Sequence, residues 1–189
     1  MRDNWDTQDN HTNTVGYLTL YKSKYEDLFD FTYKFDWKYM DETLVELNNY
    51  MKEKIDETGG NDVTDEYNLI GINSDSFQLE PKHHSFLEWD EKKYVPEMHI
   101  LEKIDGMIIE SGRGIHVIKE NNLHITELIY QMSSLNCCEG FRDNSYRKKH
   151  ATLRVSPKAN NGQLKIIKNK EGFLYSVYRE LIENLSNSI

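Results

Sequence analysis

The apolar residues of this chain recur with two different spacings, and each spacing predicts one kind of secondary structure. Short runs that alternate with polar residues, or that are continuously apolar and rich in β-formers, predict strands. Such runs cover residues 15–21, 68–72, 85–90, 106–111, 114–120, 150–156 and 163–169. Strands are therefore expected along the whole chain.

Apolar residues three and four positions apart predict four helices. These helices cover residues 41–57, 96–104, 125–135 and 172–185. Asp41 is the expected N-cap of the first helix, and Pro96 is expected at the first helical position of the second. Because strands and helices are interspersed, the predicted fold class is α+β, with a mixed or antiparallel sheet covered by helices.

The length of 189 residues suits one domain with a sizeable core. Residues 1–14 are polar and aperiodic, which predicts a flexible N-terminal tail. Residues 15–189 contain neither an internal repeat nor a low-complexity linker, so they are expected to form a single compact domain.

Composition narrows the class of protein. Hydrophobic residues make up 38% and charged residues 29%, as in a globular protein. No apolar run approaches the roughly 18 residues that a membrane span needs, and the first residues lack the apolar stretch of a signal peptide. A cytoplasmic protein without membrane contact is therefore expected. The adjacent Cys137 and Cys138 are expected to be reduced thiols, because two neighbouring cysteines make no disulfide framework.

The net charge of −9 is distributed unevenly. Residues 1–110 carry 25 acidic and 11 basic side chains, whereas residues 111–189 carry 7 and 12. Between residues 140 and 170, nine basic residues stand against Asp143 alone. This block is either a phosphate-binding surface or a solvated basic face that balances the acidic half.

Two carboxylates lie within the predicted strand at 85–90. On a strand, Glu88 and Asp90 point to one face and Trp89 to the other. Carboxylates held side by side repel each other unless a cation lies between them, and oxygen ligands suit Mg²⁺ or Mn²⁺. The alternative is a surface strand with solvated acids.

The segment ESGRGIHVI predicts two strands joined by a glycine turn. Gly112 and Gly114 allow a sharp turn whose amides can bind phosphate oxygens. Ser111 and Arg113 add a hydroxyl and a guanidinium, and His116 could reach the same ligand from the second strand. The alternative is a simple hairpin with a histidine in the core.

A third group lies in the basic block. Asp143 is either an ion-pair partner of the surrounding cations or the third carboxylate of a metal site. Arg154 lies on a predicted strand and Lys158 in the turn after it, while Arg147 and Lys148 precede that strand.

The order of these motifs resembles the archaeo-eukaryotic primase superfamily, which includes the primase–polymerases. LEWDEKK, ESGRGIHVI and RDNSYRKKHATLRVSPK correspond in order to that family's carboxylate pair, its small-x-His motif and its third carboxylate. The resemblance covers residues 85 to about 170, a little under half of the chain. It implies a catalytic core with a sheet like that of RNA-recognition domains.

The resemblance also implies a role for each residue. Metal binding and catalysis would fall to Glu88, Asp90 and Asp143, and triphosphate binding to Ser111, Gly112, Arg113, Gly114 and His116. Template or phosphate contacts would fall to Arg147, Lys148, Arg154 and Lys158. The expected cofactor is Mg²⁺ or Mn²⁺, and the expected partners are single-stranded DNA, nucleoside triphosphates and a helicase or accessory replication subunit.

The sequence therefore predicts a small DNA primase or primase–polymerase that acts in DNA replication. Two alternatives stay open at this point. One is a metal-dependent nuclease or other phosphotransfer enzyme, which is compatible with Glu88, Asp90 and Lys92 but leaves the glycine-histidine motif unexplained. The other is a non-catalytic nucleic-acid-binding module that keeps the sheet and the basic face.

Overall fold

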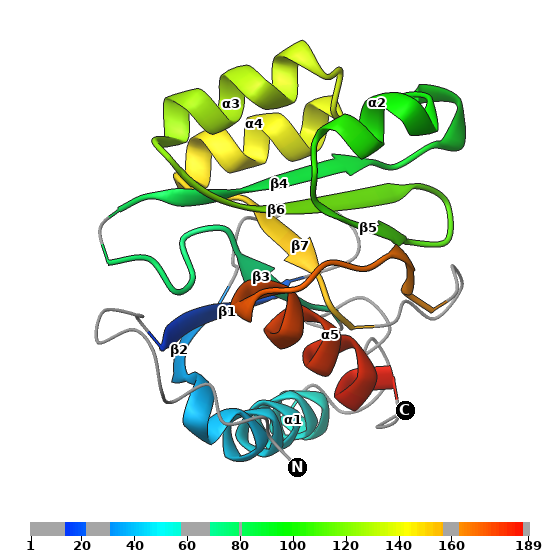
Figure 1. The fold of residues 1–189 in the computed structure, drawn as a ribbon. Helices are drawn as coiled ribbons and strands as arrows, with labels where there is room; N and C mark the ends of the chain where they lie inside the picture. Colours follow the sequence, from blue (N-terminus) through cyan, green and yellow to red (C-terminus); the bar gives the residue numbers. More distant parts are fainter. Residues whose placement is uncertain (1–13, 22–30, 58–68, 80, 157–162, 187–189) are drawn as a thin grey trace.

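The computed structural model describes residues 14–21, 31–57, 69–79, 81–156 and 163–186. Over these ranges the chain forms two four-stranded sheets and five α-helices, so the predicted α+β class is confirmed (Figure 1). Every strand pair is antiparallel. The tail predicted at 1–14 lies outside the described residues, apart from Thr14.

The first sheet has the strand order β2-β1-β3-β7. Its strands are β1 (Val15–Tyr21), β2 (Phe31–Asp36), β3 (Leu69–Asn73) and β7 (Thr152–Arg154). Strand β2 was not predicted from the sequence. It pairs with β1 along its full length, and the hydroxyls of Thr19 and Thr32 meet across the two strands at 3.3 Å.

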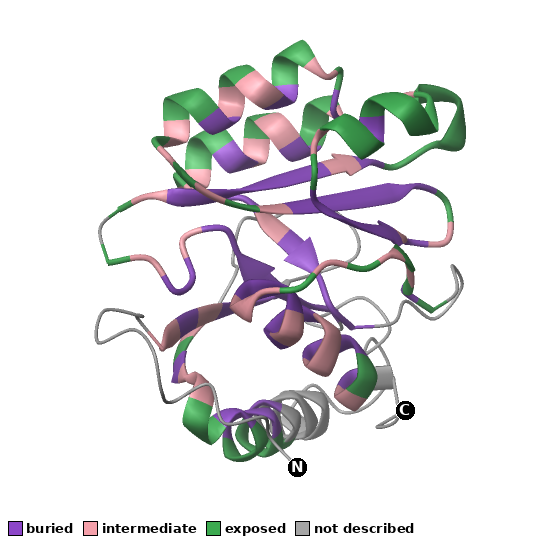
Figure 2. Ribbon diagram, viewed as in Figure 1, coloured by how far each residue is buried: buried purple, intermediate pink, exposed green. Residues whose placement is uncertain are grey.

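The second sheet has the strand order β4-β6-β5-β8. Its strands are β4 (His83–Trp89), β5 (Met107–Glu110), β6 (Ile115–Leu123) and β8 (Lys165–Lys168). Six of the seven β4 residues are buried. Burial does not alternate along this strand because helices cover one face of the sheet and the first sheet faces the other (Figure 2).

The helices pack around the two sheets. Helices α3 and α4 cover the second sheet, and α1 and α5 lie on the side of the first (Figure 1). The helices are α1 (Met40–Glu57), α2 (Met98–Lys103), α3 (Ile125–Ser134), α4 (Glu139–Lys148) and α5 (Phe173–Ser186). In the described part of the chain, none of them combines the length and the apolar character of a membrane-spanning helix.

Two predicted helix starts are wrong. Helix α1 begins at Met40, directly after the 3₁₀ helix η1 (Trp37–Tyr39), so Asp41 is no N-cap. Asp36 instead caps η1 by accepting the Lys38 backbone N–H at 3.0 Å. Helix α2 begins at Met98, two residues after Pro96. For α1, the preceding 3₁₀ helix sets where the helix begins.

Helix α4 was not predicted, although it contains Asp143. Most of its side chains are polar or charged, and Phe141 and Ser145 are its buried residues. One turn separates them, so a single narrow stripe faces the protein. The packing of this stripe against the neighbouring elements, rather than a repeated apolar pattern, accounts for the helix.

Candidate functional site

The register of β4 and β6 brings together two groups of predicted site residues. Glu88 lies directly opposite His116, and cross-strand partners point to the same face of an antiparallel sheet. This face is turned toward the first sheet. Trp89 points to the other face, where its indole N–H donates to the Leu135 carbonyl at 3.1 Å. The predicted alternation of Glu88 and Trp89 is therefore confirmed.

Asp90 lies just beyond the end of β4 and is exposed. The negative charge of Asp90 acts to raise the pKa of His116, against the larger lowering by burial, so the two side chains are electrostatic neighbours. Asp90 Oδ2 also accepts a hydrogen bond from the Cys138 thiol at 3.2 Å. The strand end thus carries a half-buried carboxylate at Glu88 and an exposed one at Asp90.

The predicted glycine turn is a tight hairpin between β5 and β6. The Ser111 N–H donates to the Gly114 carbonyl at 3.0 Å, which closes a turn with Gly112 and Arg113 at its centre. Gly112 has a φ of 88°, a conformation that favours glycine. A Cβ on Gly114 would lie 1.7 Å from the Trp89 carbonyl oxygen. The group that approaches Gly114 is therefore the protein's own backbone at the end of β4.

His116 is 3% exposed, and its Nδ1 has no hydrogen-bond partner among the described residues. Burial and, to a smaller extent, the charge of Arg154 lower the pKa of its imidazole to about 3, although the charge of Asp90 acts in the opposite direction. The imidazole is therefore neutral at ordinary pH. A buried polar atom without a partner is uncommon in proteins and marks this position as a candidate for ligand binding.

Arg154 is also buried, so this member of the basic block does not lie on an exposed basic surface. One guanidinium nitrogen donates to the Ser111 carbonyl at 3.0 Å and another to the Ser156 carbonyl at 2.9 Å. The first bond ties β7 of one sheet to the hairpin turn of the other. Arg154 thus lies between the sheets, close to His116.

Two further residues belong to this site and were not predicted. The Tyr178 hydroxyl donates to the Arg154 carbonyl at 2.6 Å, and burial raises the pKa of this phenol. In the sequence, Tyr178 lies within the apolar stripe of the closing helix and is indistinguishable from a core residue. Cys138 donates its backbone N–H to the Glu88 carbonyl at 2.9 Å in addition to its thiol bond with Asp90.

Both cysteines are free thiols, as expected. Cys137 is buried, and burial raises the pKa of its thiol to about 12. Burial also raises the pKa of the Cys138 thiol, and its hydrogen bond to Asp90 acts in the same direction. Both thiols are therefore protonated at neutral pH, and Cys138 acts as a hydrogen-bond donor.

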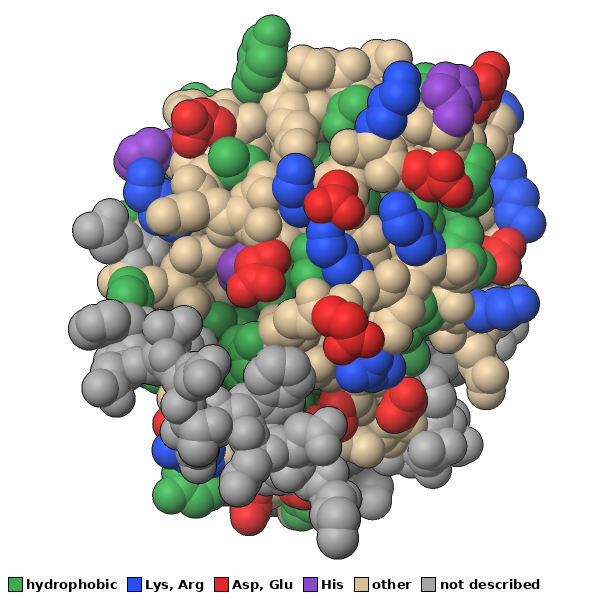
Figure 3. Space-filling model, in the orientation of Figure 1, with side chains coloured by type: hydrophobic (Ala, Val, Ile, Leu, Met, Phe, Trp, Pro, Cys, Tyr) green, Lys and Arg blue, Asp and Glu red, His purple; other side chains and the backbone are tan. Residues whose placement is uncertain are grey.

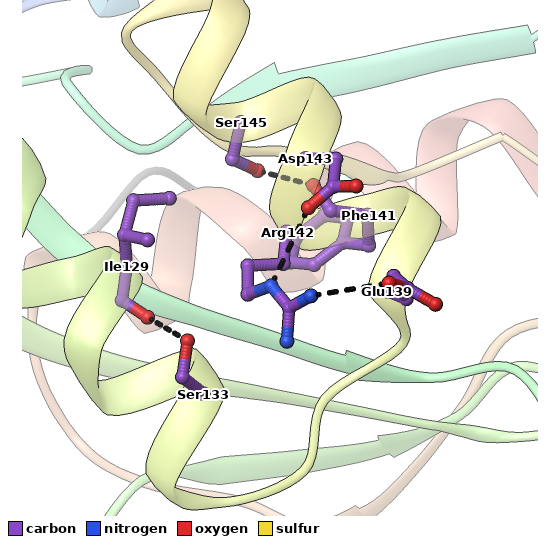
Figure 4. A network of polar contacts seen from close by, with 7 residues as sticks. All are labelled: Ile129, Ser133, Glu139, Phe141, Arg142, Asp143 and Ser145. Atoms are coloured by element: carbon purple, nitrogen blue, oxygen red, sulfur yellow. Dashed lines mark hydrogen bonds and ion pairs between the residues drawn. The ribbon is translucent and has the colours of Figure 1, made fainter.

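Asp143 lies on the exposed side of α4 and not beside a strand. Its carboxylate pairs with Arg142 Nε at 3.4 Å, and Arg142 also reaches Glu139 at 3.6 Å (Figure 4). Asp143 and Asp90 line the same open pocket. Across the described residues, no three His, Cys, Asp or Glu side chains are grouped as ligands of one metal ion.

The basic block is spread over several elements. Arg147 is exposed on α4, and Lys148 is half-buried with its ammonium pKa lowered by burial. Arg113 is exposed at the hairpin turn, and Lys158 lies outside the described residues. On the face shown in Figure 3, basic and acidic side chains are interspersed and form no single basic patch.

Comparisons with known proteins return no match for this chain, whether among models of protein families, curated protein sequences or solved structures. The resemblance to the primase superfamily therefore stays a prediction. The residues and geometry described above are what support a function.

Proposed function

We propose that this chain is a template-directed nucleotidyltransferase, a small primase or primase–polymerase that joins nucleotides on single-stranded DNA. The observation that carries the proposal is the β4–β6 register. It sets Glu88 opposite His116, with Asp90 at the end of the same strand. Arg154, more than 30 residues further along the chain, reaches the same region. Carboxylates, an imidazole and a guanidinium form a suitable set for nucleotide chemistry.

Glu88 and Asp90 would be the protein ligands of Mg²⁺ or Mn²⁺. Mg²⁺ is usually held by one or two carboxylates together with substrate phosphates, so a third protein carboxylate is not needed. When bound, the ion would activate the attacking hydroxyl and neutralise charge on the triphosphate. Asp143, which pairs with Arg142 on α4, has no part in this version of the site.

His116 would bind the nucleotide through Nδ1. Because the imidazole is neutral, Nδ1 can donate a hydrogen bond to a phosphate or sugar oxygen in the tautomer that carries its proton there. A nucleotide reaches this atom only when β7 and the hairpin turn separate, since Arg154 bonds to the Ser111 carbonyl. Arg154 would then exchange that carbonyl for a phosphate oxygen, which is a stronger, charge-assisted partner.

The first test is a primer-free synthesis assay with single-stranded DNA, labelled nucleotides and either Mg²⁺ or Mn²⁺. We expect new labelled oligonucleotides, and we expect Asp90→Ala to abolish them. Glu91→Ala is the matched control, because Glu91 is the adjacent carboxylate and pairs with Lys93 away from the site. Asp90 is exposed, so its removal should change the free energy of unfolding by less than about 1 kcal/mol. An unfolded Asp90→Ala protein would remove the main support for a metal site.

The second test separates nucleotide binding from packing at His116. His116→Ala should weaken nucleotide binding more than binding of the template, because Nδ1 is aimed at the nucleotide in this proposal. Titration of each variant with a labelled nucleotide and with a labelled oligonucleotide measures both. Equal losses in the two titrations would indicate a purely structural histidine. His99→Ala, on the exposed side of α2, should change neither.

One alternative is a non-catalytic nucleic-acid-binding module. Such a module would bind single-stranded DNA but make no product, even with a primer. A metal-dependent nuclease, the other alternative, would shorten the added strand. The same assay, resolved by strand length, therefore distinguishes all three functions.

A further inference from the structure

An open pocket of about 770 Å³ lies beside the Asp90 carboxylate, where α3 and α4 line it. The residues that matter for its chemistry are Asp90, Ile129, Arg142, Asn144, Tyr146 and Arg147. Its volume falls within the range of sites that hold small ligands, so there is room for a nucleotide unit. The pocket extends from the last turn of α4 to the end of β4.

The two guanidinium groups of the pocket pair with side chains of their own helix, α4. Arg142 pairs with Glu139 and Asp143 at 3.6 and 3.4 Å, and Arg147 donates to the Asn144 side chain at 2.5 Å. Exposed pairs of this kind contribute little to stability. An incoming phosphate can therefore replace them at low cost, and a guanidinium can hold its oxygens in bidentate fashion.

The pocket also offers an aromatic ring. Tyr146 is 56% exposed, so one face of its ring is open to a planar ligand. Lys149 Nζ lies 4.3 Å from the centre of this ring. A base stacked on Tyr146 would take the place of Lys149 and leave its ammonium next to the adjoining phosphate.

We propose that this pocket binds a single-stranded nucleic acid, with a base on Tyr146 and phosphates on Arg147 and Arg142. The inference rests on the proposed function, because the bound strand would be the template or primer that is led toward Asp90. A duplex is a poorer occupant, since its bases are stacked on one another and cannot meet the tyrosine ring. The acids Glu139 and Asp143 on the same helix also limit the basic surface to a short stretch of backbone.

The test is binding of a short labelled oligothymidylate, followed by fluorescence anisotropy without nucleotides or metal. We expect Tyr146→Ala to raise Kd by about 5-fold to 150-fold, the loss typical of one stacked base. Arg147→Ala should raise Kd and make the slope of log K against log salt shallower by about 0.7, as for one lost phosphate contact. Thermal unfolding of each variant confirms that these exposed substitutions leave the fold intact.

Matched controls lie on the opposite side of the molecule. Tyr39 is a 63% exposed tyrosine of η1, and Lys34 is an exposed cation of β2. Tyr39→Ala and Lys34→Ala should leave Kd unchanged. If they weaken binding as much as the pocket variants do, or if a duplex competes as well as the single strand, the proposal is overturned.

Synthesis of product and binding of the oligothymidylate are measured in separate assays. If Tyr146→Ala weakens oligothymidylate binding while the wild-type chain makes no product, strand binding in the pocket is supported and the proposed nucleotidyltransferase activity is contradicted. If the chain makes product and neither Tyr146→Ala nor Arg147→Ala changes Kd, strand binding in the pocket is contradicted and the nucleotidyltransferase activity is supported. An acidic peptide that binds the pocket, with no binding of the oligothymidylate, would identify a protein partner and overturn the inference.

Discussion

At the scale of single residues, Cys138 bonds to the backbone of Glu88 and to the side chain of Asp90. Its backbone N–H holds the Glu88 carbonyl, and its thiol donates to the Asp90 carboxylate. A donor at this position fixes the direction of the carboxylate, which otherwise projects into solvent at the strand end. Cys138 is therefore a positioning residue in the proposed site, although its own sequence context looks inert.

Cys138→Ala should lower kcat/KM by about 5-fold to 10-fold, the loss expected for one partly exposed hydrogen bond to a charged group. Cys138→Ser keeps a donor and should retain activity near that of the wild-type chain. The KM for Mg²⁺ or Mn²⁺ provides a second measurement, because a misdirected carboxylate binds the ion less well. Equal activities of the alanine and serine variants would argue against a positioning role.

At the scale of elements, the β5–β6 hairpin packs its turn directly against the end of β4. Gly114 faces the Trp89 carbonyl, and Gly112 takes the positive φ of the turn. This contact holds the turn next to Asp90, so the glycines position the site through the backbone. The sequence suggested that they admit a ligand, whereas at Gly114 the neighbouring strand already fills the space.

Gly114→Ala should therefore destabilise the protein by about 1–3 kcal/mol, because the added methyl group forces the turn away from β4. Gly140 is the matched control. It lies in α4, and a Cβ added there would meet no atom within 4 Å, so Gly140→Ala should stabilise the protein by about 0.5–1 kcal/mol. Urea denaturation of both variants measures the difference. A Gly114→Ala protein as stable as the wild-type chain would contradict the tight packing.

At the scale of the whole molecule, three histidines are held neutral by burial: His84 and His116 are buried, and His150 is partly buried. Burial lowers the pKa of His84 and of His150 to about 4, and that of His116 to about 3. In the unfolded chain each imidazole has a pKa near 6.5. As the pH falls below about 6.5, protons therefore bind the unfolded chain first, and the folded state loses stability.

The free energy of unfolding should consequently fall between pH 6.5 and pH 5.0, by about 1.5 kcal/mol for each of the three histidines. Urea denaturation at the two pH values measures the loss. His116→Gln should remove about 1.5 kcal/mol of this loss, the share of one buried histidine. Stability that is constant or higher at pH 5.0 would contradict burial of neutral imidazoles.

The sequence alone was sufficient for the fold class and for most elements. The seven predicted strands and four predicted helices all appear, with shifted ends, because their apolar spacing is a local property of the chain. Strand β2 and helix α4 did not follow from spacing. Helix α4 buries only Phe141 and Ser145, so its apolar stripe is too narrow to stand out.

The candidate site was only partly predictable. The sequence determined that Glu88 and Trp89 face opposite ways, and that Gly112 and Gly114 form a turn, because these are properties of neighbouring residues. Tertiary structure alone decided that Glu88 stands opposite His116 and that Arg154 lies between the sheets. It also placed Asp143 on helix α4, where it pairs with Arg142 and lines the same pocket as Asp90. Strand register and sheet packing join residues far apart in the chain, and no local pattern encodes those distances.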